Sequence, residues 1–271
     1  MQQADVDTGS FRTHYYAAGP EGAPVVVLLH DGAWGGDGQV TWSEVMQDLA
    51  TDYRVYAPDL LGFGRSDKVV YLGRAPYAPR VRQIADFCGV LGIERAHFVG
   101  TSFGGSVVLR AAEARAWPAA SLTTIGGAGG PFRTQRGIDV LGELQPGEEY
   151  LAEVVELLTN SRSGYEDNVA LRRTNTLAPG HYGAMVAPRL KHPEGAPARE
   201  PDGFPGTLRD ADAPVWLVEM SDDLVIEAGW AKEIATAAPN CRVLELAGPH
   251  SPNLTAPTEL AGHLREIFAE A

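Results

Sequence analysis

The sequence predicts an α/β protein with a mostly parallel central sheet that helices cover on both faces. Apolar runs of strand length alternate with helical patterns along most of the chain. The run Pro24–Leu29 is continuous and β-branched, as expected of a strand buried on both faces. Alternation of this kind implies parallel strands joined by helical crossovers. The segment from about 131 to 209 breaks the rhythm, because it has no run typical of a strand.

The individual elements follow from local patterns. Predicted strands in chain order are Phe11–Ala17, Pro24–Leu29, Tyr53–Ala57, Ala96–Val99, Ser121–Ile125, Pro214–Val218 and Cys241–Leu246. Predicted helices between and after them are Ser43–Ala50, Val81–Leu91, 105–112, Ala228–Ala238 and Thr258–Ala269. In Val81–Leu91 the apolar residues share one side, which is typical of a helix that packs on a sheet.

The irregular segment predicts a helical lid insertion at 131–209, set into a core formed by residues 1–130 and 210–271. Within it, amphipathic helices are expected at Ile138–Leu144, Tyr150–Leu158 and Asn168–Thr176. The stretch 195–206 is rich in proline and glycine, and we expect it to be a linker that returns the chain to the core.

Composition bounds the function. The chain has 271 residues, 44% of them apolar, and a formal net charge of −13. That charge favours solubility and leaves no basic excess for binding nucleic acid. No apolar run approaches a membrane span and no signal peptide is visible, so a cytoplasmic protein without membrane contact is expected. Cys88 and Cys241 lack metal-ligand spacing and are expected to be reduced and packed. We expect no metal and no cofactor, and a homodimer is left open.

The segment Gly100-Thr101-Ser102-Phe103-Gly104 is the strongest chemical signal. It lies between the strand at 96–99 and the helix at 105–112, and glycines flank the serine at −2 and +2. This pattern in this setting indicates a nucleophile elbow, in which small neighbours let strand and helix close around a strained serine. The amide N–H of Phe103 would then stand at a helix N-terminus, where it can stabilise an oxyanion.

A serine hydroxyl needs a base and a group that orients the base. In this architecture an acid and then a histidine should follow the serine, on loops after late strands. Asp222 and Asp223 follow the strand that ends at Val218, and His250 follows the strand that ends at Leu246. A solvated turn and an ordinary loop histidine are the alternatives, which the order of the three loop positions disfavours.

The remaining histidines compete less well for the role of base. His30 ends a central strand and is expected to organise the loop after it. His181, in the insertion, is a candidate for lining a substrate pocket. His14 is expected at the surface, because its strand neighbours are polar.

Together these residues resemble the α/β-hydrolase superfamily over nearly the whole chain. The matching pieces are His30-Asp31-Gly32, Pro58–Asp67, the turn at Ser102, Ser221–Ile226 and His250. The resemblance places the triad acid at Asp223, with Asp222 as the alternative. It places the second oxyanion donor at the backbone N–H of Gly32.

Two stretches, 53–64 and 96–105, look like the meta-cleavage-product hydrolases, which cut carbon–carbon bonds in vinylogous diketo acids. In the insertion, 171–176 followed by Pro179-Gly180 is similar to the lid segment that carries the substrate-binding arginine of those enzymes, and the match falls on Arg172. A guanidinium aimed into an apolar pocket suits a carboxylate through two charge-assisted hydrogen bonds. A solvated helix arginine is the alternative.

Two positions depart from that family's pattern. Asp31 interrupts the glycine-rich loop after His30, and Ser251 replaces the tryptophan that usually follows the catalytic histidine. A carboxylate beside an oxyanion hole opposes the developing charge unless it points away or is paired, so Asp31 is expected to face outward and fix the loop. Trp34 is expected to supply the pocket wall lost at position 251.

The sequence therefore predicts a hydrolase in which Ser102 forms an acyl-enzyme on a small organic carbonyl substrate. Carbon–carbon cleavage of a diketo-acid-like compound is one expectation, and ester or lactone hydrolysis is the alternative. Serine at position 102 argues against the dehalogenase and epoxide-hydrolase branches, which place aspartate there. A non-enzymatic small-ligand receptor on the same scaffold is an alternative of another class, and a cofactor-free oxygenase or lyase is a third.

Overall fold

A computed structural model of the chain describes residues 1–70, 76–143, 147–189 and 203–271. Its centre is a sheet of eight strands in the order β1-β2-β4-β3-β5-β6-β7-β8. The strands are β1 (Gln2–Asp7), β2 (Arg12–Ala18), β3 (Val25–Leu29), β4 (Arg54–Pro58), β5 (Ala96–Thr101), β6 (Ala119–Ile125), β7 (Val215–Met220) and β8 (Cys241–Leu246). β2 pairs antiparallel with both β1 and β4, and all the other pairs are parallel. The predicted mostly parallel sheet is confirmed.

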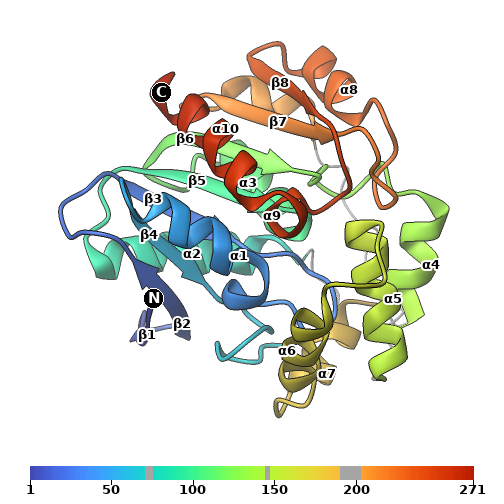
Figure 1. The fold of residues 1–271 in the computed structure, drawn as a ribbon. Coiled ribbons are helices and arrows are strands. Elements are labelled where there is room, and N and C mark those ends of the chain that lie inside the picture. Colours follow the sequence, from blue (N-terminus) through green and yellow to red (C-terminus); the bar gives the residue numbers. More distant parts are fainter. Residues whose placement is uncertain (71–75, 144–146, 190–202) are drawn as a thin grey trace, which may run out of the picture.

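Helices cover both faces of the sheet, as Figure 1 shows. One face packs against α2 (Ala78–Leu91), α3 (Phe103–Ala114) and α8 (Trp230–Ala237), and the other against α1 (Gly38–Leu49) and α10 (Pro257–Ala269). Alternate residues of β3 enter the two cores: Val27 and Leu29 enter the first, and Val26 and Leu28 the second. The continuous apolar run in β3 therefore follows from burial on both faces.

The helical insertion lies between β6 and β7, beyond the carboxyl ends of the parallel strands (Figure 1). It contains α4 (Gln135–Glu143), α5 (Glu148–Thr159), α6 (Glu166–Thr176), α7 (His181–Val186) and the 3-10 turns η1 (Ala187–Arg189) and η2 (Gly206–Asp210). In the described parts of 131–209 no strand occurs, in line with the expected helices. The predicted linker 195–206 falls mostly on residues outside the described ranges.

Sequence patterns missed or shortened a few elements. β1 is polar and almost wholly exposed, so it joins the sheet through its backbone and carries no apolar signal. α1 begins at Gly38 rather than Ser43, because the Asp37 carboxylate caps it by accepting the Val40 N–H at 2.7 Å. The short helix α9 (Pro252–Thr255) begins two residues after His250, with Ser251 between them. Among the described residues, no helix has both the length and the apolar character needed to cross a membrane.

Candidate active site

Ser102 occupies a sharp turn between β5 and α3, with φ 53° and ψ −119°. Such a backbone is strained for a residue with a side chain and persists only where its surroundings enforce it. A Cβ atom at Gly100 would lie 2.3 Å from the carbonyl oxygen of Gly104, and one at Gly104 would lie 2.3 Å from that of Leu29. The glycines at −2 and +2 are thus required by backbone contact, and the predicted elbow geometry is present.

His250 and Asp223 lie together at the carboxyl ends of β8 and β7. Asp223 Oδ2 is 2.7 Å from His250 Nδ1, and both side chains are almost fully buried. Asp223 Oδ1 accepts the backbone N–H groups of Val225 at 2.7 Å and Ile226 at 3.0 Å, which fix the carboxylate. Asp222 is exposed and accepts from the Ser221 hydroxyl instead. The contact to His250 therefore belongs to Asp223.

A glycine turn after β6 packs against both the histidine and the serine. A Cβ atom at Gly126 would lie 2.9 Å from Cε1 of His250, and one at Gly127 would lie 2.4 Å from the carbonyl oxygen of Ser102. The Ser102 N–H donates to the Ile125 carbonyl at 2.8 Å. Within the described residues, Nε2 of His250 is buried and has no hydrogen-bond partner, so this nitrogen is available as a base.

The candidate oxyanion donors Gly32 and Phe103 are in contact, since a Cβ atom at Gly32 would lie 2.5 Å from that of Phe103. Phe103 is the first residue of α3, and the first N–H groups of a helix have no intrahelical acceptor. His30 Nε2 accepts the Leu60 N–H at 2.9 Å, so Nδ1 carries the proton and donates to the Asp31 carbonyl at 2.6 Å. Burial lowers the pKa of His30, in keeping with a neutral ring. His30 organises its loop, as expected.

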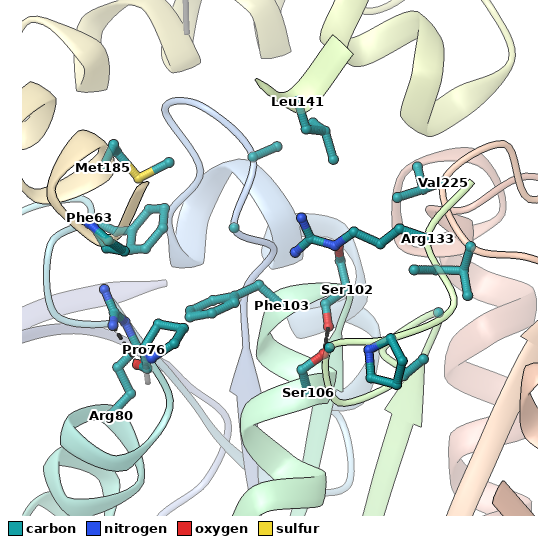
Figure 2. A pocket seen from close by; sticks show the side chains of 18 of the residues that line it. Phe63, Pro76, Arg80, Ser102, Phe103, Ser106, Arg133, Leu141, Met185 and Val225 are labelled. Carbon is teal, nitrogen blue, oxygen red and sulfur yellow. Dashed lines mark hydrogen bonds between the residues drawn. The ribbon is translucent and has the colours of Figure 1, made fainter. Parts of the chain in front are cut away.

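A cavity of about 240 Å³ opens beside Ser102, Phe103 and Gly32. Its size lies below the usual range of ligand pockets, roughly 300–1,000 Å³, and suits a small substrate. Residues of the core and of the insertion between β6 and β7 share the lining, and the insertion contributes Pro131, Arg133, Leu141, Ala184, Met185 and Pro188. Figure 2 shows Met185 and Leu141 across the cavity from Ser102.

Among the described residues that line this cavity, the only charged side chains are Arg80 and Arg133. Arg80 is buried and donates to the carbonyls of Leu61 and Pro76, each at 2.6 Å. Arg133 is exposed, and its guanidinium has no hydrogen-bond or ion-pair partner within the described part of the chain. In Figure 2 the Arg133 side chain reaches into the cavity on the side of Ser102, and Arg80 lies beyond Phe103. Neither arginine is marked by a motif in the sequence.

The predicted positions of the Arg172 and Asp31 side chains are wrong. Arg172 lies on α6 with its side chain fully buried, away from the cavity lining. Its Nη2 and Nη1 atoms bind Asp31 Oδ2 and Oδ1 at 2.8 and 3.2 Å. Asp31 faces inward and is 1% exposed. It does fix its loop as predicted, because Oδ1 accepts the Ala33 N–H at 2.8 Å.

Trp34 and His181 also do not line the cavity, contrary to expectation. They are buried and pack edge to face at 5.3 Å, and His181 lies 5.9 Å from the ring of Phe63, which does line it. His181 Nδ1 donates to the Gly62 carbonyl at 3.0 Å, and burial lowers its pKa to about 4. These rings therefore support the cavity wall from behind.

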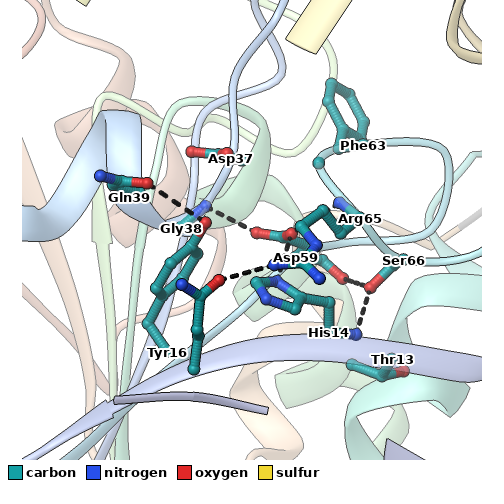
Figure 3. Close-up of polar contacts among 12 residues, drawn as sticks. Thr13, His14, Tyr16, Asp37, Gly38, Gln39, Asp59, Phe63, Arg65 and Ser66 are labelled. Atoms are coloured by element: carbon teal, nitrogen blue, oxygen red, sulfur yellow. Dashed lines mark hydrogen bonds and ion pairs between the residues drawn. The ribbon is translucent and has the colours of Figure 1, made fainter. Parts of the chain in front are cut away.

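A buried polar cluster around Asp59 anchors the other side of the His30 loop (Figure 3). Asp59 contacts His14 Nδ1 at 2.9 Å and accepts the N–H groups of Gly38 at 2.9 Å and Arg65 at 2.8 Å. His14 is 1% exposed, so the expectation that it lies at the surface is wrong. Burial, and then the charge of Asp59, raise the pKa of the neighbouring Asp37 to about 7.

Comparison with known proteins assigns the chain to a family. The model of the alpha/beta hydrolase family matches residues 26–263. The chain belongs to this family.

No group of three or more His, Cys, Asp or Glu residues that could hold a metal ion occurs among the residues the structure describes.

Among relatives of this alpha/beta hydrolase, 2-hydroxymuconate semialdehyde hydrolase of Pseudomonas sp. (strain CF600) is 28% identical, over 72% of this chain and 70% of its own. 2-Hydroxy-6-oxo-2,4-heptadienoate hydrolase of Pseudomonas putida (strain F1) is 28% identical, over 80% and 78%. The solved structure of 2-hydroxy-6-oxo-6-phenylhexa-2,4-dienoate hydrolase from Rhodococcus sp. strain RHA1 superimposes with a TM-score of 0.80 at 22% identity, covering 100% and 99%. The predicted similarity to meta-cleavage-product hydrolases and the hydrolase class are confirmed.

Proposed function

We propose that this alpha/beta hydrolase uses Ser102, His250 and Asp223 as a catalytic triad on a small organic carbonyl substrate. The observation that carries the proposal is the 2.7 Å contact between Asp223 Oδ2 and His250 Nδ1, next to a glycine turn that also holds Ser102. Asp223 keeps the proton on Nδ1, so Nε2 is the basic nitrogen.

The reaction would proceed through an acyl-enzyme. Ser102 Oγ bonds to the carbonyl carbon, its proton passes to His250 Nε2, and the N–H groups of Phe103 and Gly32 receive the oxyanion. The leaving group departs with the proton from His250. Water then attacks the acyl carbon with His250 as base, which releases the acid and restores the serine hydroxyl.

Carbon–carbon cleavage of a diketo-acid-like compound is supported by the similarity to 2-hydroxymuconate semialdehyde hydrolase and 2-hydroxy-6-oxo-2,4-heptadienoate hydrolase. In that case the carbon fragment must be ketonised before it leaves, so that its carbanion is stabilised, and His250 would move that proton. Ester or lactone hydrolysis is the second candidate, and the burial of Arg172 against Asp31 favours it. The guanidinium that the resemblance assigned to a substrate carboxylate already holds a carboxylate of the protein.

Labelling with a fluorophosphonate tests the nucleophile. We expect stoichiometric modification of the wild type and none of Ser102→Ala, with Ser106→Ala as the matched control, because Ser106 also lines the cavity. Absence of labelling in the folded wild type would sink the acyl-enzyme proposal. Parallel assays with a vinylogous diketo acid and p-nitrophenyl esters then separate the two bond classes.

A further inference from the structure

One polar face of the lid helix α6 is bound to the loop that carries Gly32. Asn168, Arg172 and Asn175 are spaced by four and three residues, so they share a side of the helix. Asn168 Nδ2 donates to the Val40 carbonyl at 3.0 Å. Asn175 Nδ2 donates to the Gly35 carbonyl at 3.0 Å and to Asp37 at 2.8 Å. Asn175 thus ties the helix to this loop, and Asn168 ties it to the first turn of α1, which follows the loop.

The centre of this contact is a buried fork between Arg172 and Asp31. The two terminal nitrogens of Arg172 bind the two carboxylate oxygens, and Nε donates to Asn168 Oδ1 at 2.9 Å. The Thr41 hydroxyl donates to Asp31 Oδ2 at 2.9 Å. Burial by itself raises the pKa of Asp31, but the charge and hydrogen bonds of Arg172 outweigh it and hold that pKa at about 2. Both groups are therefore charged, and each satisfies the other.

The backbone of α6 comes equally close to the loop. A Cβ atom at Gly35, where φ is +73°, would lie 2.3 Å from the carbonyl oxygen of Arg172. Only glycine allows both this conformation and this approach. Loop and helix therefore meet as one packed unit rather than through a single pair of side chains.

The backbone on each side of Gly32 is held by a hydrogen bond. On one side the Asp31 carbonyl is held by His30 Nδ1, and on the other the Ala33 N–H is held by the Asp31 carboxylate. In a trans peptide the N–H points opposite to the carbonyl of the same unit. Fixing the Asp31 carbonyl therefore fixes the direction of the Gly32 N–H. Arg172 in turn fixes the side chain of Asp31.

We propose that Arg172 is a positioning residue: through the Asp31 carboxylate it holds the Gly32 N–H in place to receive the oxyanion, and it does not bind the substrate. This inference rests on the proposed function of Ser102. Because a donor misplaced by about 1 Å can cost on the order of 100-fold in rate, loosening the fork should lower kcat for every substrate.

The test compares Arg172→Lys, which keeps the charge but loses the fork, with Thr41→Val, which removes only one hydrogen bond to Asp31. Arg173→Gln is the matched control, since Arg173 is on the same helix and pairs with Glu148 at the surface. Substrates are neutral p-nitrophenyl acetate and the anionic mono-p-nitrophenyl ester of succinic acid. We expect Arg172→Lys to lower kcat about 10- to 100-fold for both esters with KM within about twofold. Thr41→Val should give a smaller loss of the same kind.

A second readout separates donor placement from general damage to the fold. Affinity for a trifluoromethyl ketone, whose adduct with Ser102 carries an oxyanion, should fall by the same factor as kcat, while binding of the corresponding alcohol stays unchanged. A rise in KM for the anionic ester alone would assign Arg172 to the substrate and overturn the inference. Wild-type kcat in folded Arg172→Lys or Thr41→Val would overturn it too, even if the fluorophosphonate labels Ser102. Failure of that labelling in the wild type overturns the proposed function and this inference with it.

Discussion

Two arginines in the helical segment after β6 have opposite surroundings. Arg172 is fully buried and grips the Asp31 carboxylate with both terminal nitrogens. Arg133 is exposed at the cavity, and its guanidinium has no partner among the described residues. A buried guanidinium that already holds a carboxylate is a structural element, whereas an unpaired one at a cavity can still take an anionic ligand. The sequence motif indicated Arg172 as the residue that binds an anionic substrate group, whereas the surroundings of the two side chains favour Arg133.

The largest expected difference between them is in stability. Arg172→Gln leaves the buried Asp31 charge without its partner, so we expect the free energy of unfolding to fall by about 3 to 5 kcal/mol. Arg133→Gln removes an exposed charge that has no hydrogen-bond or ion-pair partner among the described residues, so we expect a change within about 0.5 kcal/mol. Urea titrations followed by circular dichroism measure both. Similar small losses in the two variants would show that the Arg172 pair does not matter to the fold.

The ion pair between Asp31 and Arg172 should also make the free energy of unfolding depend on pH in the acidic range. The pKa of Asp31 is about 2 in the folded protein against an ordinary value of 3.8, so its contribution is present above pH 4 and is lost as the pH falls toward 2. At about 1.4 kcal/mol per pKa unit, it amounts to about 2 kcal/mol at pH 5 and about half of that at pH 3. The double variant Asp31→Asn/Arg172→Gln lacks this term. The difference in unfolding free energy between wild type and double variant should therefore change by about 1 kcal/mol over this range, and a constant difference would contradict the pKa.

The parts of the site that the sequence predicted are those set by local backbone geometry. The elbow at Ser102 needs its glycines because neighbouring backbones approach to within contact, and that requirement is visible in the sequence. The loops of Asp223 and His250 follow strands, so their order along the chain indicated where they would lie. The same reasoning predicted the parallel sheet from the alternation of strands and helices.

The rest depended on contacts between distant segments. Asp31 and Arg172 are 141 positions apart, and the packing of α6 on the loop decides that they meet. The need of Asp31 for a partner was visible, and so was the spacing of Asn168, Arg172 and Asn175 on one side of a helix, but no local rule joins the two observations. Arg133 was missed because its position in the cavity depends on how the segment after β6 pairs with the loop after β7, where Arg133 and Ile226 form an isolated antiparallel bridge.

The last prediction tests the other arginine. If Arg133 meets an anionic group of the substrate, Arg133→Gln should lower kcat/KM for the anionic succinate ester about tenfold and leave p-nitrophenyl acetate unchanged. A charge-assisted hydrogen bond contributes about 1.5 to 3 kcal/mol, and solvent at this exposed position reduces it toward the 1.4 kcal/mol that a factor of ten represents. Arg136→Gln is the control, because Arg136 is exposed close by and is not among the residues lining the cavity. Added salt should shrink the effect of Arg133→Gln, since the interaction is electrostatic. Equal losses of kcat/KM for both esters would mean that Arg133 shapes the cavity and does not bind the charged group of the substrate. In that case neither arginine would bind an anionic substrate group.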